Sequence, residues 1–245
     1  MAYAITEDIV VPKGYVYSVS RLSPGFHQSH LHSTGNPTAT MRNERNYLAG
    51  HFDTANYNYL VGIENGNVLI LHVMDDNGGA WDVGGDWNWE TYAAIEFAEG
   101  SIQSQADFNK AYPAYIWLAR YLSQKAGIPL TIDNQNTSGI KTHNYASYTG
   151  HGSDHVDPIP FLTKWGVSRD KLNHDIVYGI GNDGAPVKPS TPSTPSKPVA
   201  KQSAIDMFKA GNGAYVNTKS FKVDKIAYVN GMWQIINYTL AGGKD

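Results

Sequence analysis

The sequence predicts an α/β protein with a central mixed β-sheet flanked by helices, followed by a small β-rich, SH3-like module. Strand-like and helix-like segments alternate along the first part of the chain, which is typical of a sheet covered by helices. Residues 104–126 repeat apolar side chains every three or four positions, as an amphipathic helix does. Proline recurs every third position in residues 186–198 and predicts an extended spacer. We therefore expect three parts, namely a large first domain over 1–184, a linker over 185–200 and a small module over 201–245.

The first segments of the chain predict an edge strand, an inner strand and a helix. Residues 1–22 contain short apolar alternation and are interpreted as an arm or edge strand. Residues 26–36 alternate in the way a strand does, so His30 and His32 share one face, and a Gly-Asn-Pro turn ends the run. Residues 40–51 favour a helix that begins at a threonine cap, either Thr38 or Thr40.

A hairpin, a long loop and a buried strand are expected next. Residues 57–63 and 67–73 are strand-like and are joined by an Asn-Gly hairpin signal. The Gly-, Asp- and Trp-rich residues 78–89 indicate a loop. Residues 91–97 predict a buried strand that carries Glu96 among apolar neighbours. A carboxylate in such surroundings is costly unless it is paired, hydrogen-bonded or functional.

The strongest helix prediction covers residues 104–126. Pro113 should kink this helix or mark a new first turn, and Gly127 should end it. The remaining predicted elements are a short strand-like run at 129–132, helices at 160–165, 169–178 and 203–210, and strands at 222–228 and 232–238. The tail is near the lower size limit for independent folding, so we expect it to be incomplete or to associate with another copy of the chain.

Composition excludes several classes of protein. The formal net charge of -3 argues against a nucleic-acid-binding protein, which usually gathers basic residues on one face. No apolar run is long enough for a transmembrane helix, and the N-terminus lacks the basic and apolar regions of a secretory signal. The chain has no cysteine, which removes disulfides, thiolate nucleophiles and Cys-ligated metals. A protein made in a reducing cytoplasm and acting outside it would suit this composition.

Histidines and aspartates gather in residues 141–162. The run contains His143, His151, Asp154, His155 and Asp157, all of which are side chains that zinc accepts. Its glycines and prolines rule out one regular helix, so we expect these side chains to be mounted on a loop. A solvated polar loop is the alternative interpretation of the same residues.

Four motifs occur in an order that points to a known family. They are HSTGNP (32–37), AIEF (94–97), THNYAS (142–147) and HVDPIPFL (155–162). Together they resemble the zinc-dependent N-acetylmuramoyl-L-alanine amidases of the type 2 amidase and peptidoglycan-recognition-protein superfamily, over roughly residues 20–180. The linker and tail resemble the modular layout of phage endolysins that attack Gram-positive walls.

The resemblance implies a set of site residues. His32, His143 and Asp157 would be the three ligands of a zinc ion (Zn²⁺), with His30 as the competitor for the first position. Glu96 would activate the zinc-bound water, and Tyr57 and His155 would stabilise the oxyanion. Many relatives carry lysine or threonine where this chain has His155. Asn58 and Asp82 also stand where some relatives have histidines lining the cleft.

The implied activity is hydrolysis of the amide bond between N-acetylmuramic acid and L-alanine in Gram-positive peptidoglycan. The protein would be made in the host cytoplasm and would reach the wall after release, without inserting into the membrane. We expect its tail to bind the wall through aromatic residues, including Tyr228, Trp233 and Tyr238. A non-catalytic peptidoglycan-binding protein is one alternative, and a glycosidase is another. We expect Glu96 and Glu99 to face opposite sides of a strand, which would disfavour the glycosidase.

Overall fold

The structure, a computed structural model, describes residues 2–16, 26–180, 221–229 and 232–240. The chain divides into two compact units, Met1–Lys188 and Pro189–Asp245. The predicted linker and the predicted helix at 203–210 lie outside the described residues. Among the residues that are described, no helix is both long and apolar enough to cross a membrane.

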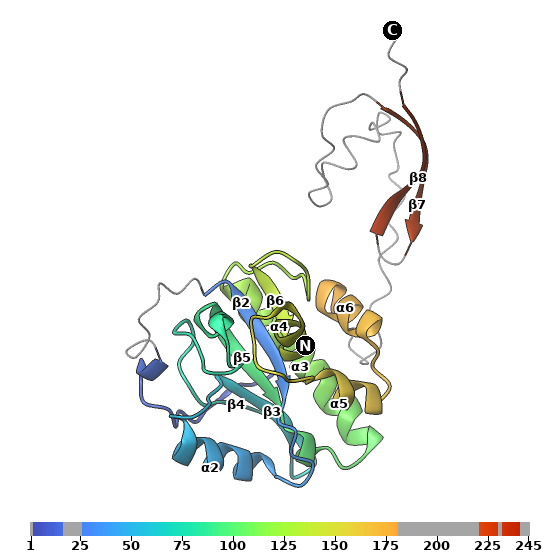
Figure 1. Ribbon diagram of the computed structural model, residues 1–245. Helices are drawn as coiled ribbons and strands as arrows, with labels where there is room; N and C mark the ends of the chain where they lie inside the picture. Colours follow the sequence, from blue (N-terminus) through green and yellow to red (C-terminus); the bar gives the residue numbers. More distant parts are fainter. Residues whose placement is uncertain (1, 17–25, 181–220, 230–231, 241–245) are drawn as a thin grey trace. The chain divides into compact units, whose positions relative to one another are not determined.

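The first unit is built on a six-stranded mixed sheet in the order β1-β4-β3-β5-β2-β6 (Figure 1). Neighbouring strands are parallel except for the antiparallel hairpin of β3 and β4. This arrangement confirms the predicted mixed sheet. The strands are β1 (Thr6–Glu7), β2 (Gln28–Ser33), β3 (Tyr59–Glu64), β4 (Asn67–His72), β5 (Thr91–Phe97) and β6 (Gly139–Thr142).

Helices cover both faces of this sheet (Figure 1). α3, α5 and α6 share one apolar core with the sheet, and α2 packs into a second core on the opposite face. The helices are α2 (Met41–His51), α3 (Gln105–Lys125), α4 (His143–Thr149), α5 (Ile159–Lys164) and α6 (Arg169–Tyr178), with short 3-10 helices η1 (Asp86–Trp89) and η2 (Glu99–Ser101).

Side-chain alternation along β2 and β5 separates the core from the polar face. Leu31 and Ile95 are fully buried in the core shared with α3. His30, His32 and Glu96 occupy the alternating positions and face the other way, because successive strand side chains point to opposite faces. Burying a Leu or Ile side chain stabilises a fold by about 1.5–3 kcal/mol, so this alternation holds the register that fixes the polar residues.

Most predicted elements in the first unit are confirmed. Thr40 is the N-cap of α2, with its side chain accepting a hydrogen bond from the backbone N–H of Asn43. Asn65 and Gly66 have φ angles of 51° and 75°, as a tight hairpin turn requires. Gly127, at φ 71°, follows the end of α3. The N-terminal edge strand is reduced to Thr6–Glu7, which pairs with β4.

One of the two alternatives for Pro113 is wrong, and so is the expected loop position of His143. α3 is a single helix through Pro113, so this proline does not mark a new first turn. Burial of the apolar face of α3 outweighs the local cost of an interior proline, about 3 kcal/mol. His143 is not mounted on a loop either. It is the first residue of α4 and directly follows β6, because the side chain of Thr142 accepts a hydrogen bond from the backbone N–H of Tyr145 and caps the helix.

The second unit contains one described feature, an antiparallel pair of strands. β7 (Phe221–Val229) pairs with β8 (Met232–Leu240), in agreement with the two strands predicted there. The SH3-like architecture of the tail stays a prediction.

Candidate metal centre

Two neighbouring parallel strands place a histidine beside a glutamate. In the register of β2 and β5, His32 is paired with Glu96, and both side chains leave the sheet on the same face. The imidazole of His32 is 2 % exposed. Tyr115 of α3 donates a hydrogen bond to the backbone carbonyl of His32 at 2.9 Å, which ties this end of β2 to the helix behind it.

The end of β6 supplies the second histidine and draws in an aspartate from later in the chain. His143 begins α4, and Asp133 holds the preceding residue by accepting hydrogen bonds from the backbone N–H and hydroxyl of Thr142 at 2.8 Å each. The backbone N–H of Asn144 donates to the carbonyl of Asp157 at 2.9 Å. This link brings the carboxylate of Asp157 next to the ring of His143.

His32, His143 and Asp157 converge as the resemblance implied. Nδ1 of His32 is 3.2 Å from Oδ2 of Asp157, and Nδ1 of His143 is 3.4 Å from its Oδ1. One ligand atom from each residue lies within 4.8 Å of the others. Tetrahedral zinc with ligands at about 2 Å requires neighbouring ligand atoms a little over 3 Å apart. The three side chains therefore fit a zinc ion and leave a fourth position for water or substrate.

The ionisation of Asp157 suits a metal ligand. Burial alone would raise the pKa of the Asp157 carboxyl, but hydrogen bonds and charge interactions with His143 and His32 hold it well below its usual range. The group therefore offers a carboxylate anion together with two imidazoles, which is the mixed nitrogen and oxygen donor set that zinc accepts.

Glu96 and Tyr57 each carry an unpaired polar atom beside this group. Burial, together with neighbouring acidic groups and against the opposing effect of His32, raises the pKa of Glu96 to about 8. Its Oε2 atom and the hydroxyl of Tyr57 are buried without a hydrogen-bond partner. A buried polar atom without a partner costs about 1–3 kcal/mol, so such atoms mark positions where a ligand or water completes the structure.

His155 lies at the rim of the group. Its ring stacks on that of His143 with a centroid separation of 4.4 Å and an interplanar angle of 4°. Its Nδ1 atom is 3.5 Å from Oδ1 of Asp157, and its side chain is 58 % exposed. The ring is therefore accessible to a molecule that approaches the three converging side chains.

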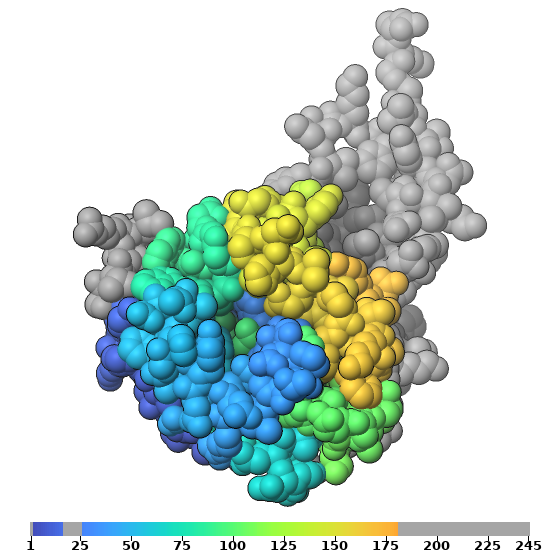
Figure 2. Space-filling model, turned by 60° about the horizontal axis from the view of Figure 1, so that its bottom comes forward, coloured from blue at the N-terminus to red at the C-terminus, as the bar shows by residue number. Residues whose placement is uncertain are grey.

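The group opens into a surface hollow. A cavity of about 680 Å³ is lined by His32, Glu96, His143, His155 and Asp157 among others. A second cavity of about 480 Å³ shares His143, His155 and Asp82 with it, so the two run past the same side chains. Figure 2 shows a face of the molecule that is hollowed between blue segments of the N-terminal part and the yellow segment around α4.

The expectation that Glu96 and Glu99 face opposite sides of a strand is wrong. β5 ends at Phe97, and Glu99 belongs to η2 rather than to the strand. Glu96 and Glu99 consequently line the same cavity instead of facing opposite sides. Glu99 Oε1 accepts hydrogen bonds from the hydroxyl of Ser33 at 2.7 Å and from the backbone N–H of Gly35 at 3.3 Å.

Other histidines of the chain lie outside the group. His151 stacks on Trp87 at 4.3 Å and contacts the carboxylate of Asp86 at 2.9 Å. His30 is fully buried, with its Nδ1 atom 2.6 Å from Asp82 rather than near Asp157. Sequence reasoning assigned no role to Asp82 beyond lining a cleft, because the loop that carries it has no periodic pattern.

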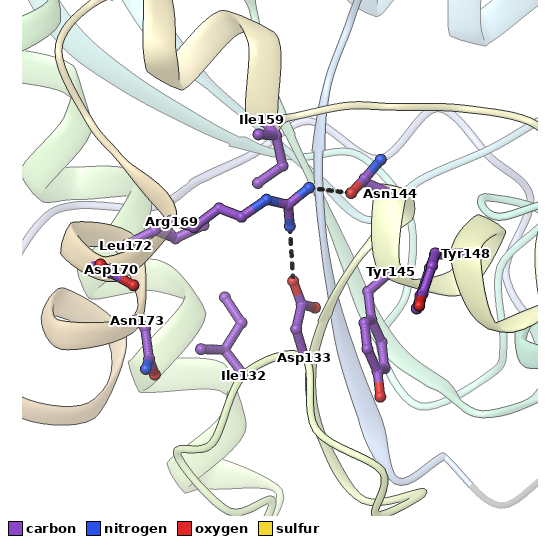
Figure 3. A pocket seen from close by; sticks show the side chains of 10 residues that line it. All are labelled: Ile132, Asp133, Asn144, Tyr145, Tyr148, Ile159, Arg169, Asp170, Leu172 and Asn173. Carbon is purple, nitrogen blue, oxygen red and sulfur yellow. Dashed lines mark hydrogen bonds and ion pairs between the residues drawn. The ribbon is translucent and has the colours of Figure 1, made fainter. Parts of the chain in front are cut away.

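A further cavity of about 450 Å³ is lined by residues 132–133 and by side chains of α4, α5 and α6 (Figure 3). Arg169 reaches across it, with its guanidinium hydrogen-bonded to Asn144 and 3.9 Å from the carboxylate of Asp133. None of the residues predicted for the site lines this cavity.

The fold and the group together describe an α/β protein with a His–His–Asp site that could hold a metal ion. Residues 27–160 match the model of the N-acetylmuramoyl-L-alanine amidase family. This match covers more than half of the 245 residues, and the chain belongs to that family.

Two curated relatives are phage lysins. The chain is 42% identical to the lytic amidase of Streptococcus pneumoniae phage HB-3 over 161 residues, which are 63% of this chain and 48% of that protein. It is 34% identical to the endolysin of Listeria phage A511 over 194 residues, which are 77% of this chain and 54% of that protein. The chain thus spans about half the length of the curated relatives it matches.

Solved structures share the fold at lower identity. The hydrolase AmiA of Staphylococcus aureus, solved in complex with its ligand, superposes with a TM-score of 0.60 at 23% identity, covering 72% of this chain and 82% of the solved AmiA chain. The structure of PlyL superposes with a TM-score of 0.53 at 19% identity, covering 73% of this chain and 100% of the solved PlyL chain.

Proposed function

We propose that this protein is a zinc-dependent peptidoglycan hydrolase that cleaves the amide bond between N-acetylmuramic acid and L-alanine. The observation that carries the proposal is the convergence of His32, His143 and Asp157 beside the unpaired Oε2 of Glu96. Membership of the amidase family supports the choice of bond.

The proposed chemistry divides the work among few side chains. Zinc bound by His32, His143 and Asp157 would polarise the scissile carbonyl and lower the pKa of water. Glu96 takes the proton of the attacking water and delivers a proton to the leaving nitrogen. A general acid and base works best with a pKa near the working pH, and burial brings that of Glu96 to about 8.

Tyr57 and His155 are proposed to donate hydrogen bonds to the oxyanion that forms as the carbonyl carbon becomes tetrahedral. The buried hydroxyl of Tyr57 has no partner of its own, and the negative charge of Glu96 raises the pKa of Tyr57 beyond the effect of burial, which indicates that the two are close. His155 is exposed at the rim, where its ring can meet the substrate.

We infer that the substrate is the peptidoglycan of a Gram-positive wall, which the protein meets after release from the host cytoplasm as an endolysin. The named phage lysins among its relatives support this setting. The tail would hold the wall. The non-catalytic binding protein is disfavoured because three side chains that could hold a metal ion lie beside an acidic residue suited to proton transfer.

The position of Glu99 keeps a glycosidase as the second candidate, because two carboxylates in one cavity are what glycosidases use. Digestion of purified walls separates the two reactions. The amidase must release new amino termini without new reducing sugar ends, must stop when a chelator removes zinc, and must recover when zinc returns. New reducing ends that survive chelation would establish the glycosidase instead.

A further inference from the structure

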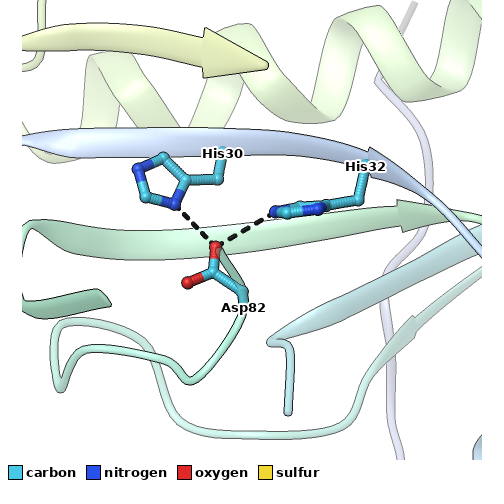
Figure 4. Close-up of side chains that lie close together, drawn as sticks. All are labelled: His30, His32 and Asp82. Carbon is cyan, nitrogen blue, oxygen red and sulfur yellow. Dashed lines mark hydrogen bonds and ion pairs between the residues drawn. The ribbon is translucent and has the colours of Figure 1, made fainter. Parts of the chain in front are cut away.

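A second His–His–Asp group lies behind the candidate metal centre and shares His32 with it. It consists of His30, His32 and Asp82, and Figure 4 shows the carboxylate of Asp82 between the two rings. Oδ2 of Asp82 is 2.6 Å from Nδ1 of His30 and 3.1 Å from Nε2 of His32. The side chains of His30 and Asp82 are 0 % and 2 % exposed.

The hydrogen bonds around His30 indicate a hydrogen-bonded chain rather than a second metal site. The side-chain amide of Gln28 donates from Nε2 to the carbonyl of Thr137 at 2.7 Å, so its Oε1 atom faces Nε2 of His30, also at 2.7 Å. That ring nitrogen must carry a proton, because an amide oxygen only accepts. The hydroxyl of Thr91 lies 3.1 Å from Oδ1 of Asp82. His30 thus has protein partners at both ring nitrogens.

Asp82 determines which nitrogen of His32 keeps its proton when a metal binds. A carboxylate accepts hydrogen bonds, so the nitrogen that faces it, Nε2 of His32, carries the ring proton. Nδ1 lies 3.2 Å from Asp157, and a metal held by these two side chains would take the place of the proton at that nitrogen. A metal binds only the unprotonated nitrogen of an imidazole, so the contact with Asp82 selects the tautomer that can bind one.

Val83, the residue after Asp82, contacts His143 in the way that Asp82 contacts His32. The backbone carbonyl of Val83 lies 3.2 Å from Nε2 of His143, which leaves Nδ1 of that ring facing Asp157. The backbone at Val83 is itself held in place, because Oδ1 of Asn88 accepts hydrogen bonds from the backbone N–H groups of Val83 and Gly84 at 3.0 and 3.1 Å. The consecutive residues Asp82 and Val83 therefore contact the Nε2 atoms of the two histidines.

We propose that Asp82 and Val83 are positioning residues that fix the tautomer and orientation of both histidines. The carboxylate of Asp82, held by His30, directs Nδ1 of His32 toward the metal, and the carbonyl of Val83 does the same for His143. This inference rests on the proposed zinc site and adds the residues that prepare it. Partners of this kind typically change metal affinity by roughly 10–100-fold when they are removed.

Zinc affinity, measured by competition with a chelator, tests the role of Asp82. Asp82→Ala should weaken zinc binding by roughly 10–100-fold, whereas Asp82→Asn should weaken it less because its amide oxygen still accepts from His32. Asp175→Asn is the matched control, since the side chains of Asp175 and Asp82 are 0 % and 2 % exposed and Asp175 accepts a hydrogen bond from Tyr112, away from the site. The control should lose stability against urea and keep the wild-type zinc affinity. Wild-type affinity in Asp82→Ala would overturn the proposal.

The wild-type protein provides a second test that does not depend on a variant folding. Nitrogen-15 NMR of the zinc-loaded protein should show the His32 and His143 rings protonated at Nε2 and zinc-bound at Nδ1. A proton on Nδ1 of His32, or two zinc ions per chain, would contradict the positioning role. A wild-type chain that binds no zinc would reject the metal centre itself, which distinguishes the failure of the two proposals.

Discussion

The pKa of Glu96 differs from that of an exposed glutamate because the side chain is buried. Its place on β5 next to His32 is set by strand register, and burial raises its pKa to about 8. His32 opposes this effect, and a bound cation would oppose it further. A residue that holds its proton near neutral pH but stands beside positive charge is suited to accept and return a proton during hydrolysis.

Replacing Glu96 separates proton transfer from metal binding. Glu96→Gln keeps the shape of the side chain but cannot take a proton from water. We expect kcat to fall by about 10²- to 10⁴-fold while zinc content stays at the wild-type level. Wall-lysis rates measured beside metal analysis check this, and retained activity would remove Glu96 from the mechanism.

At the scale of elements, the site depends on close contact between the loop before β5 and the segment after α4. A Cβ atom added at Gly85 would lie 2.1 Å from the carbonyl oxygen of His151, and one added at Gly84 would lie 2.8 Å from the hydroxyl of Ser153. No real side chain fits at 2.1 Å from a backbone oxygen. Glycine at these positions thus allows the loop that carries Asp82 to reach the histidines.

Gly85→Ala should therefore separate the two segments and weaken both stability and zinc binding. Gly50→Ala serves as the control, because Gly50 lies in α2 and a Cβ atom there meets nothing within 4 Å. At that exposed position of the helix, alanine should raise the free energy of unfolding by about 0.5–1 kcal/mol. Urea denaturation and zinc competition would measure both variants. Equal zinc affinity in Gly85→Ala and wild type would contradict the contact argument.

The edge of the sheet should respond to pH through His72. This residue ends β4, where Nδ1 is 2.8 Å from Glu7 of β1 and Nε2 is 3.5 Å from Asp76. Burial lowers the pKa of His72, but the two carboxylates outweigh it and the net pKa is raised. The protonated ring therefore stabilises the folded chain below the usual histidine pKa of about 6.5, and this contribution is lost as pH rises through the raised value.

Comparing wild type with His72→Gln isolates that contribution. The difference in the free energy of unfolding should be largest near pH 6 and should shrink as the pH rises above it. Urea denaturation across this range provides the measurement. A difference that grows with pH would show that His72 is not stabilised in its charged form.

The sequence predicted the long elements well and the short ones poorly. α3 and the β3–β4 hairpin were foreseen because periodicity and an Asn-Gly turn are local signals. β6 and α4 were missed because a strand of four residues followed by a helix of seven carries little pattern. Motifs identified the ligand candidates, but the role of Asp82 depends on contacts with His30 and His32, far away along the chain, which no local signal reports.

At the scale of the whole molecule, the fold gathers distant segments at one place. Parallel strands β2 and β5 end beside α4, so His32, Glu96 and His143 meet although they are far apart in sequence. The second unit is described only as an antiparallel pair of strands, and wall binding by its aromatic residues stays a prediction, as does its association with a second copy.

The zinc content of the purified protein tests the central claim most directly. Wild type and Asp154→Ala, which changes an exposed acid of the same cavity three residues earlier, should each carry one zinc ion per chain after dialysis. Asp157→Ala should lose its zinc together with its wall-lysing activity, because a site with only two imidazoles binds the ion weakly. A zinc ion retained by Asp157→Ala at the wild-type level would contradict the account.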